Sequence, residues 1–261
     1  MQQITSKDNA WIKEYGKLAS SKGERDRTGR FVLESVKLFR EAVQSGLSIE
    51  MVFVTETCFC KQEQELEKLF QGLRVCQIPS ALERKLSQAQ TPQGVYAIAQ
   101  KLDKSFSLDK IETSGRYLML VGLQDAGNVG TMIRTAEALG VEGVILADHT
   151  CDIYNPKVIR GSMGSVFRVP FYQADEAGIL LEELRRRRVS TYAAVLDPDA
   201  ALLGKLAFDD PAVLLIGNEG NGLPPELAAK CTQRVTIPMP GNTESLNASM
   251  AACILLWEMT K

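Results

Sequence analysis

The sequence contains one histidine and no Cys-x-x-Cys pair, and these two absences exclude several kinds of chemistry. A histidine-rich metal site cannot be built from His149 alone, and hydrolysis by a Ser-His-Asp triad would depend entirely on that residue. Six scattered cysteines without zinc-ligand spacing indicate reduced thiols and no bound metal. We therefore expect a mechanism that works without histidine and without a metal ion.

Long hydrophobic runs are absent as well. The longest uncharged stretch near the C-terminus, Ser245–Trp257, is about seven residues shorter than a membrane-spanning helix, so it predicts a buried helix. Met1–Tyr15 is polar and charged, without the apolar centre of a secretory signal. We expect a cytoplasmic protein that does not bind a membrane.

Acidic residues are outnumbered only in the N-terminal part of the chain. Residues 1–110 hold 17 Lys and Arg against 14 Asp and Glu, whereas the remainder holds 13 against 18. Six of the N-terminal cations lie close together: Lys13, Lys17, Lys22, Arg25, Arg27 and Arg30. Two interpretations remain open, an arm that binds phosphates and a solvated helix face.

Helix and strand patterns divide the chain into two α/β domains, residues 1–104 and 105–261. In the first, helical spacing predicts a helix over Val32–Gly46, and short apolar runs predict strands. The predicted strands are Met51–Val54, Arg74–Ile78 and Val95–Gln100. Lys101–Ser114 is polar and has no clear period, so we expect the domain linker there.

The second domain alternates strands and helices more strongly. Its predicted strands are Tyr117–Leu123, Val144–Ala147, Val166–Phe171, Thr191–Leu196, Ala212–Ile216 and Arg234–Ile237. Alternation with helices predicts a mostly parallel sheet, because parallel strands need crossover connections that are usually helical. Ligands of such sheets bind beyond the carboxyl ends of the strands.

Three segments follow predicted strands at those ends. They are Asn128-Val129-Gly130 with Arg134, the glycine-rich run Gly217–Gly222 around Glu219, and Ile237–Gly241 leading into Ser245-Leu246-Asn247. The chain has no Gly-x-Gly-x-x-Gly and no Gly-Lys-Thr/Ser, so the dinucleotide and nucleoside-triphosphate fingerprints are absent. We expect the three segments to surround one crevice.

Each segment also has a simpler explanation. Arg134 has the spacing of a surface ion pair with Glu137, and Asn247 is a good N-cap for the helix that follows. At the start of the helix near Asn128–Gly130, the backbone N–H groups are expected to form a surface that binds anions. Taken one at a time, the segments do not decide between structure and function.

In this order and with this content, the three segments resemble the signature of the SpoU (TrmH) family of RNA ribose 2′-O-methyltransferases, within the SPOUT superfamily. The run Asn155–Phe167 resembles the family's stretch between its first and second motifs. Phe31–Gly46 and Thr91–Val95 are similar to the small α/β N-terminal substrate-binding domain that many members carry. The resemblance covers most of the chain and is strongest over residues 118–257.

The resemblance implies an α/β catalytic domain with a mostly parallel sheet and a C-terminal deep trefoil knot that binds S-adenosylmethionine. The catalytic residues that it implies are Arg134, Asn128, Glu219, Ser245 and Asn247. The cofactor-binding residues that it implies are Leu215, Gly217, Asn218, Gly220, Ile237, Pro238, Met239, Leu246, Asn247 and Ala248. Family members pair through this domain, so a homodimer is expected.

The reaction implied is attack of a ribose 2′-hydroxyl on the cofactor's methyl group, most simply in ribosomal RNA. A guanidinium with a pKa above about 12 is a poor base, so we expect Arg134 to hold the RNA phosphate. Asn128 would hold Arg134 or the ribose, and Glu219 would fix the loops or pair with Arg134. Ser245 and Asn247 would bind substrate or cofactor. The alternatives are methylation of transfer RNA and an RNA-binding factor without catalysis.

Overall fold

The computed structural model describes residues 1–102, 111 and 114–261, which belong to two compact units. One unit holds Met1–Asp103 and Asp152–Phe167, and the other holds Lys104–Cys151 and Arg168–Lys261. The predicted linker, Lys101–Ser114, lies mostly outside the described residues. The segment Asp152–Phe167 thus packs with the first unit, although its sequence lies in the range expected for the second domain.

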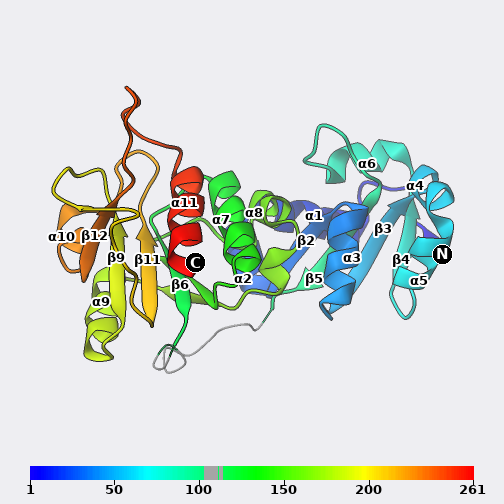
Figure 1. Ribbon diagram of the computed structural model, residues 1–261. Helices are drawn as coiled ribbons and strands as arrows, with labels where there is room; N and C mark the ends of the chain where they lie inside the picture. Colours follow the sequence, from blue (N-terminus) through cyan, green and yellow to red (C-terminus); the bar gives the residue numbers. More distant parts are fainter. Residues whose placement is uncertain (103–110, 112–113) are drawn as a thin grey trace. The chain divides into compact units, whose positions relative to one another are not determined.

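The first unit is built on a five-stranded mixed sheet (Figure 1). Its strand order is β1 (Gln2–Gln3), β4 (Val75–Ile78), β3 (Ile49–Thr55), β5 (Val95–Gln100) and β2 (Arg30–Glu34). Strands β1, β4 and β3 are parallel, and β5 is antiparallel to both β3 and β2. The helices are α1 (Ala10–Ser20), α2 (Lys22–Thr28), α3 (Val36–Gln44), α4 (Glu56–Lys61), α5 (Glu63–Leu69), α6 (Ser80–Leu86) and α8 (Pro156–Ser162).

The helix predicted over Val32–Gly46 is wrong at its start. Strand β2 occupies Arg30–Glu34 and pairs with β5, and α3 begins only at Val36. Ser35 separates the two elements with a φ of 109°. A short, fully buried apolar run can form either a strand or a helix, so its composition does not distinguish the two. Here, pairing with the distant strand β5 makes the run a strand.

Aromatic and charged contacts hold the segment Asp152–Phe167 in the first unit. The ring of Phe31 lies 4.9 Å from that of Tyr154 and 6.3 Å from that of Phe167, centroid to centroid. Arg25 is buried, and its Nε lies 2.7 Å from a carboxylate oxygen of Asp152. Arg25 is therefore a structural residue of this unit.

The other N-terminal cations are also largely paired within the unit. The ion pairs join Lys13 to Asp8, Lys22 to Asp26, Arg27 to Glu24, and Arg30 to Glu14 and Glu50. These residues belong to ordered helices and a strand, so they form a paired, solvated face. Of the two interpretations, these ion pairs favour the solvated face.

The second unit confirms the prediction of a mostly parallel α/β sheet. Its seven strands are all parallel, in the order β10, β12, β9, β11, β6, β7, β8. Their bounds are β6 (Arg116–Val121), β7 (Gly143–Ala147), β8 (Phe171–Ala174), β9 (Ser190–Ala194), β10 (Ala201–Leu202), β11 (Ala212–Ile216) and β12 (Gln233–Thr236).

Helices cover both faces of this sheet. Helices α9 (Ala177–Arg186) and α10 (Pro225–Ala228) pack on the face that presents Met119 and Leu215. Helices α7 (Ala126–Ala138) and α11 (Ala248–Thr260) pack against each other and contact β7 and β11, respectively. No helix in the described part of the chain is long and apolar enough to cross a membrane.

The strand predicted over Val166–Phe171 is also wrong. Residues Ser165–Phe167 form a 3₁₀ turn whose apolar side chains are buried, and β8 starts only at Phe171. Pro170 directly precedes the strand, and a proline has no N–H to donate to a ladder. The apolar run is therefore divided between the cores of the two units.

Candidate active site

The three sequence segments begin at the same edge of the parallel sheet. Strands β6, β11 and β12 end at Val121, Ile216 and Thr236, and all three run in the same direction. The residues that follow these strands therefore share the carboxyl edge, where ligands of α/β sheets bind.

Side-chain amides join the three segments to one another. Asn128 Nδ2 donates to Glu219 Oε1 at 3.3 Å, and Asn247 Nδ2 donates to Asn128 Oδ1 at 3.2 Å. Asn247 Oδ1 in turn accepts the backbone N–H groups of Ser249 at 2.9 Å and Met250 at 3.3 Å. Asn247 is thus both the N-cap of α11 and the link to α7.

Glu219 ties the glycine-rich loop to the loop before α7. Its carboxylate accepts the backbone N–H groups of Gln124 at 3.2 Å and Asp125 at 3.0 Å. Burial raises the pKa of this carboxyl, but hydrogen bonds from the backbone of Glu219, Asp125 and Gln124 and from Asn128 outweigh it and lower the pKa below 4.5. Glu219 is therefore ionised at neutral pH and acts as a fixed acceptor.

The start of α7 differs from the expectation of an anion-binding surface. Asp125 is the N-cap, and its Oδ1 accepts the backbone N–H groups of Gly127 at 2.6 Å and Asn128 at 3.2 Å. The chain's own carboxylate therefore already occupies the position that a bound anion would take.

The glycine-rich loop closes tightly on itself. Asn218 Oδ1 accepts the backbone N–H of Gly220 at 2.9 Å, and Asn218 Nδ2 donates to the carbonyl oxygen of Gly122 at 2.9 Å. A Cβ at Gly217 would lie 2.2 Å from the carbonyl carbon of Gly222. Only glycine fits at position 217, because any side chain would force the two backbone segments apart.

A cavity of 530 Å³ lies beside these loops. Small-molecule sites typically have volumes of about 300 to 1,000 Å³. We call it the strand-end cavity. Of the predicted site residues, those that line it are Gly217, Asn218, Glu219, Gly220, Ile237, Met239, Ser245, Leu246 and Ala248. Leu215 is buried within β11, and Pro238 and Asn247 are not part of the lining.

Sequence reasoning missed one wall of this cavity. Residues Ala194–Pro198, at the end of β9, line it together with Arg234 of β12. The side chains of Asp197 and Arg234 form an ion pair there. Strand β9 also ends at the carboxyl edge, so its position in the parallel sheet is the signal that could have identified this wall.

Arg134 lies apart from the linked cluster. Its side chain is exposed on α7 and makes no hydrogen bond or ion pair with any described residue. Glu137, the partner expected for a surface ion pair, bonds to Arg168 Nη2 at 3.0 Å instead. Arg134 is also absent from the described lining of the strand-end cavity.

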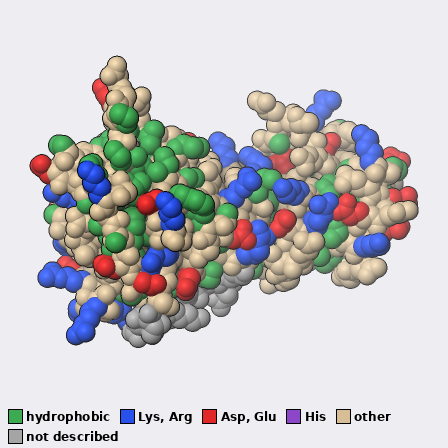
Figure 2. Space-filling view, in the orientation of Figure 1, with side chains coloured by type: hydrophobic (Ala, Val, Ile, Leu, Met, Phe, Trp, Pro, Cys, Tyr) green, Lys and Arg blue, Asp and Glu red, His purple; other side chains and the backbone are tan. Residues whose placement is uncertain are grey.

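An apolar stripe is exposed on α11, beside α7. Met250, Ile254 and Trp257 are 53%, 41% and 59% exposed, and their spacing places them on one side of the helix. Thr135 of α7 contacts Cys253 of α11, with Oγ1 and Sγ 3.0 Å apart. Figure 2 shows hydrophobic side chains gathered over this part of the unit. Such a patch on a surface marks an interaction site.

Comparison with known proteins gives relatives over the whole chain. The chain is 31% identical over 260 residues to the 23S rRNA (guanosine(2553)-2′-O)-methyltransferase RlmP of Bacillus subtilis, covering 99% of both chains. It is 29% identical to the 23S rRNA (uridine(2479)-2′-O)-methyltransferase of Streptomyces viridochromogenes, covering 99% of this chain and 92% of that protein.

Solved structures have the same fold. The AdoMet-bound rRNA methyltransferase of Sinorhizobium meliloti superposes with a TM-score of 0.83 at 30% identity, covering 99% of this chain and 97% of the other. The SpoU methyltransferase AviRb of Streptomyces viridochromogenes, in complex with AdoMet, gives 0.80 at 29% identity, with 97% of each chain covered.

Family profiles match both halves of the sequence. Residues 9–97 match the MRM3-like substrate binding domain, and residues 115–257 match the SpoU rRNA Methylase family. The second match contains Asn128, Arg134, Glu219 and Asn247, the residues on which the resemblance rested. The chain belongs to the SpoU rRNA methylase family.

Proposed function

We propose that this protein transfers a methyl group from S-adenosylmethionine to a ribose 2′-hydroxyl of ribosomal RNA. The observation that carries the proposal is the hydrogen-bonded link from Glu219 through Asn128 to Asn247, which lies beside the strand-end cavity. Three relatives that are 23S rRNA 2′-O-methyltransferases support the same reaction. We propose the cytoplasm as the compartment of this protein, because all six cysteines are free thiols.

The strand-end cavity fits the cofactor. Its volume of 530 Å³ suits a small molecule, and it offers apolar side chains such as Ile237 and Met239 beside the backbone of Gly217 and Gly220. When bound, S-adenosylmethionine supplies the electrophilic methyl group. The charged side chains of the lining are Asp197, Glu219 and Arg234, an excess of one negative charge that complements a sulfonium cation.

The proposed fold includes a trefoil knot in the C-terminal part. Strand β11 lies between β6 and β9, β12 lies on the far side of β9, and α11 then packs against α7 and β11. The chain therefore returns across the sheet after β12. This return, and the contact of Asn247 with Asn128, support a knotted arrangement of the segments at 217–222 and 237–247.

The protein is proposed to act as a homodimer that pairs through α7 and α11. The stripe Met250, Ile254 and Trp257 supplies the apolar surface. Arg134 lies on the same pair of helices and has no partner in the described part of its own chain. We place it at the site of the partner subunit, where its guanidinium would hold the phosphate next to the reacting hydroxyl.

We assign two roles to the site residues: they position the substrate, and they stabilise the charge that develops during the reaction. Both polar atoms of the Asn128 amide are already bonded, so Asn128 holds the loops in place. Ser245 is exposed in the cavity lining and makes no hydrogen bond with the described residues, so its hydroxyl is available to substrate or cofactor. The proton of the 2′-hydroxyl passes to a phosphate oxygen or to water.

The proposal is tested by incubating the purified protein with S-adenosylmethionine carrying a tritiated methyl group and with transcribed 23S rRNA. We expect label in RNA that resists alkaline cleavage at the labelled nucleotide, since a 2′-O-methyl group blocks attack on the adjacent phosphate. Label on a base would contradict the proposed chemistry. Light scattering is expected to give twice the chain mass, and a monomeric mass would contradict the dimer.

A further inference from the structure

A second cavity, within the first unit, has a different character from the strand-end cavity. It has a volume of 450 Å³ and lies where α3, α4, α6 and the loop before β5 meet. Its charged lining residues are Lys37, Arg40, Lys61 and Glu83. We call it the basic pocket. Three cations against one carboxylate indicate an anionic ligand.

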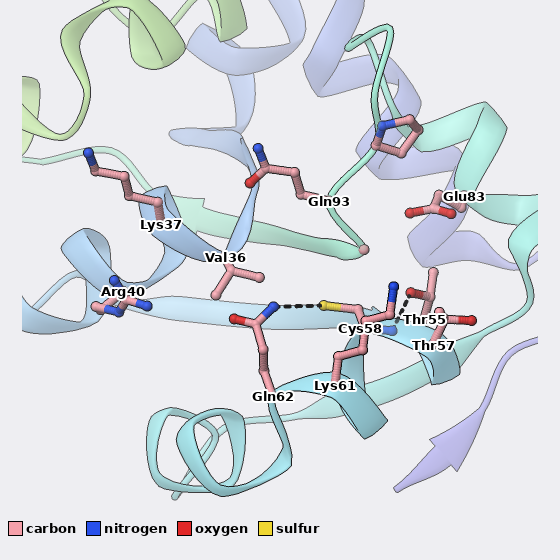
Figure 3. A pocket seen from close by; sticks show the side chains of 12 residues that line it. Val36, Lys37, Arg40, Thr55, Thr57, Cys58, Lys61, Gln62, Glu83 and Gln93 are labelled. Carbon is pink, nitrogen blue, oxygen red and sulfur yellow. Dashed lines mark hydrogen bonds between the residues drawn. The ribbon is translucent and has the colours of Figure 1, made fainter.

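The charges are separated within the basic pocket. Figure 3 shows Lys37 and Arg40 on one side and Glu83 on the other, with Val36, Gln93, Gln62 and Lys61 between them. A ligand that fills this pocket therefore has a negative group at one end and hydrogen-bond donors at the other. A nucleotide has that distribution, with its phosphate separated from its base by the ribose.

The cations are available for binding. Lys37 and Lys61 are exposed and make no ion pair with any described residue. Arg40 pairs with Glu65, which leaves the two lysines as the main phosphate ligands. Lys37 also lies in the first turn of α3, where the helix dipole favours negative charge.

Glu83 is held in a fixed orientation at the opposite end. Its Oε1 accepts the hydroxyl of Tyr96 at 3.2 Å, and Oε2 makes no hydrogen bond with the described residues. Burial, followed by the charge of Glu83, raises the pKa of Tyr96, so this hydroxyl stays a donor. The exocyclic amino groups of adenine, cytosine and guanine can donate to the open oxygen, whereas uracil has no amino group and offers only its N3–H, which lies between two carbonyls.

The loop that forms one wall of the pocket is fixed at both ends. At its start, the buried Glu34 accepts the backbone N–H of Gln88 at 3.1 Å and a hydrogen bond from Arg160 at 3.2 Å. At its end, Gly94 has a φ of 79°, and a Cβ there would lie 2.3 Å from Cys58 Cβ. A pocket preformed in this way loses little entropy on binding.

We propose that the basic pocket binds one unpaired nucleotide of the substrate RNA, with its two flanking phosphates at Lys37 and Lys61 and an amino-bearing base at Glu83. Unpaired bases that are turned out of a loop are the usual targets of sequence-specific RNA recognition. The proposal rests on the proposed function for the identity of the polymer. It assigns a specific recognition site to the first unit, within residues that match a substrate binding domain.

The test compares the double variant Lys37→Ala/Lys61→Ala with the control Arg84→Ala/Lys85→Ala. The control removes two exposed cations of α6 that do not line the pocket. Binding of the full chain to transcribed 23S rRNA is measured by filter retention at several salt concentrations. We expect the pocket variant to bind at least about tenfold more weakly, with a salt slope smaller by about 0.7 or more.

Base recognition is tested with unstructured oligonucleotides of A, C or U as competitors. The wild type should prefer the A and C oligomers, and Glu83→Gln should reduce that preference at least about fivefold. Equal loss of RNA affinity in the pocket and control variants would overturn the proposal, as would an unchanged affinity in the pocket variant. Calorimetry with S-adenosylmethionine separates the two proposals, because failure of wild-type cofactor binding would refute the proposed function and leave the RNA comparison intact.

Discussion

The strand-end cavity and the basic pocket differ in what lines them and in how they are built. The strand-end cavity has two acids, one cation and a lining of glycine backbone and apolar side chains, whereas the basic pocket has three cations and one acid. The first lining suits a cationic small molecule and disfavours a phosphate chain. The second suits a phosphate. Cofactor and RNA phosphate therefore need not compete for one surface, because each cavity suits only one of them.

Arg134 lines neither the strand-end cavity nor the basic pocket, as far as the described residues show. Its substitution should therefore separate the rate of methyl transfer from the affinity for the cofactor most clearly. We expect Arg134→Ala to lower the methyl-transfer rate by at least about 10² to 10³, because a preorganised charge at the reacting phosphate is lost. Calorimetric affinity for S-adenosylmethionine should stay at the wild-type value. Arg185→Ala, which removes an exposed arginine from α9, is the control and should keep full activity.

Gly217→Ala should damage the strand-end cavity alone. The added Cβ would lie 2.2 Å from the backbone of Gly222, so the loop has to open. We expect a loss of about 1–3 kcal/mol in unfolding free energy and a cofactor affinity at least about tenfold weaker. At Gly241, in the third segment, a Cβ would meet nothing within 4 Å. If Gly241→Ala lost as much stability and cofactor affinity as Gly217→Ala, this explanation would be contradicted.

The sequence predicted the position of the site better than its contacts. Strands β5 and β11 occupy the predicted residues Val95–Gln100 and Ala212–Ile216, because each is a compact apolar run between clear breakers. Local patterns also placed the three segments at strand ends. They could not show that Glu219 binds the backbone of Gln124 or that Glu34 holds the loop at Gln88, because these contacts depend on how the chain folds back on itself.

Variants of Asn247 test whether its role as the N-cap of α11 can be separated from its hydrogen bond to Asn128. Asn247→Asp keeps an acceptor for the start of α11 but removes the amide that donates to Asn128. We expect thermal stability close to that of the wild type and a methylation rate lower by about tenfold. Asn247→Ala should in addition lose about 1 kcal/mol of stability. Identical stabilities in the two variants would show that the cap contributes nothing.

Glu219 should give the smallest effect, and that effect should disappear in acid. Its folded pKa lies below 4.5, so the carboxylate stabilises the folded state above that pH and the stabilisation is lost as the pH falls through the folded pKa. The melting temperature of the wild type should therefore exceed that of Glu219→Gln at pH 7, and the difference should shrink as the pH falls through the folded pKa of Glu219. A constant difference across this range would contradict the assignment of the ionised form.

Mapping of ribose methylation tests the proposed function most directly. Transcribed 23S rRNA is incubated with S-adenosylmethionine and either the wild type or Arg134→Ala, and positions that resist alkaline cleavage are located by sequencing. We expect one or a few new 2′-O-methylated nucleotides with the wild type and none with the variant. The absence of any alkali-resistant position with the wild type would contradict the proposed reaction, and equal ribose methylation by both proteins would contradict the role of Arg134.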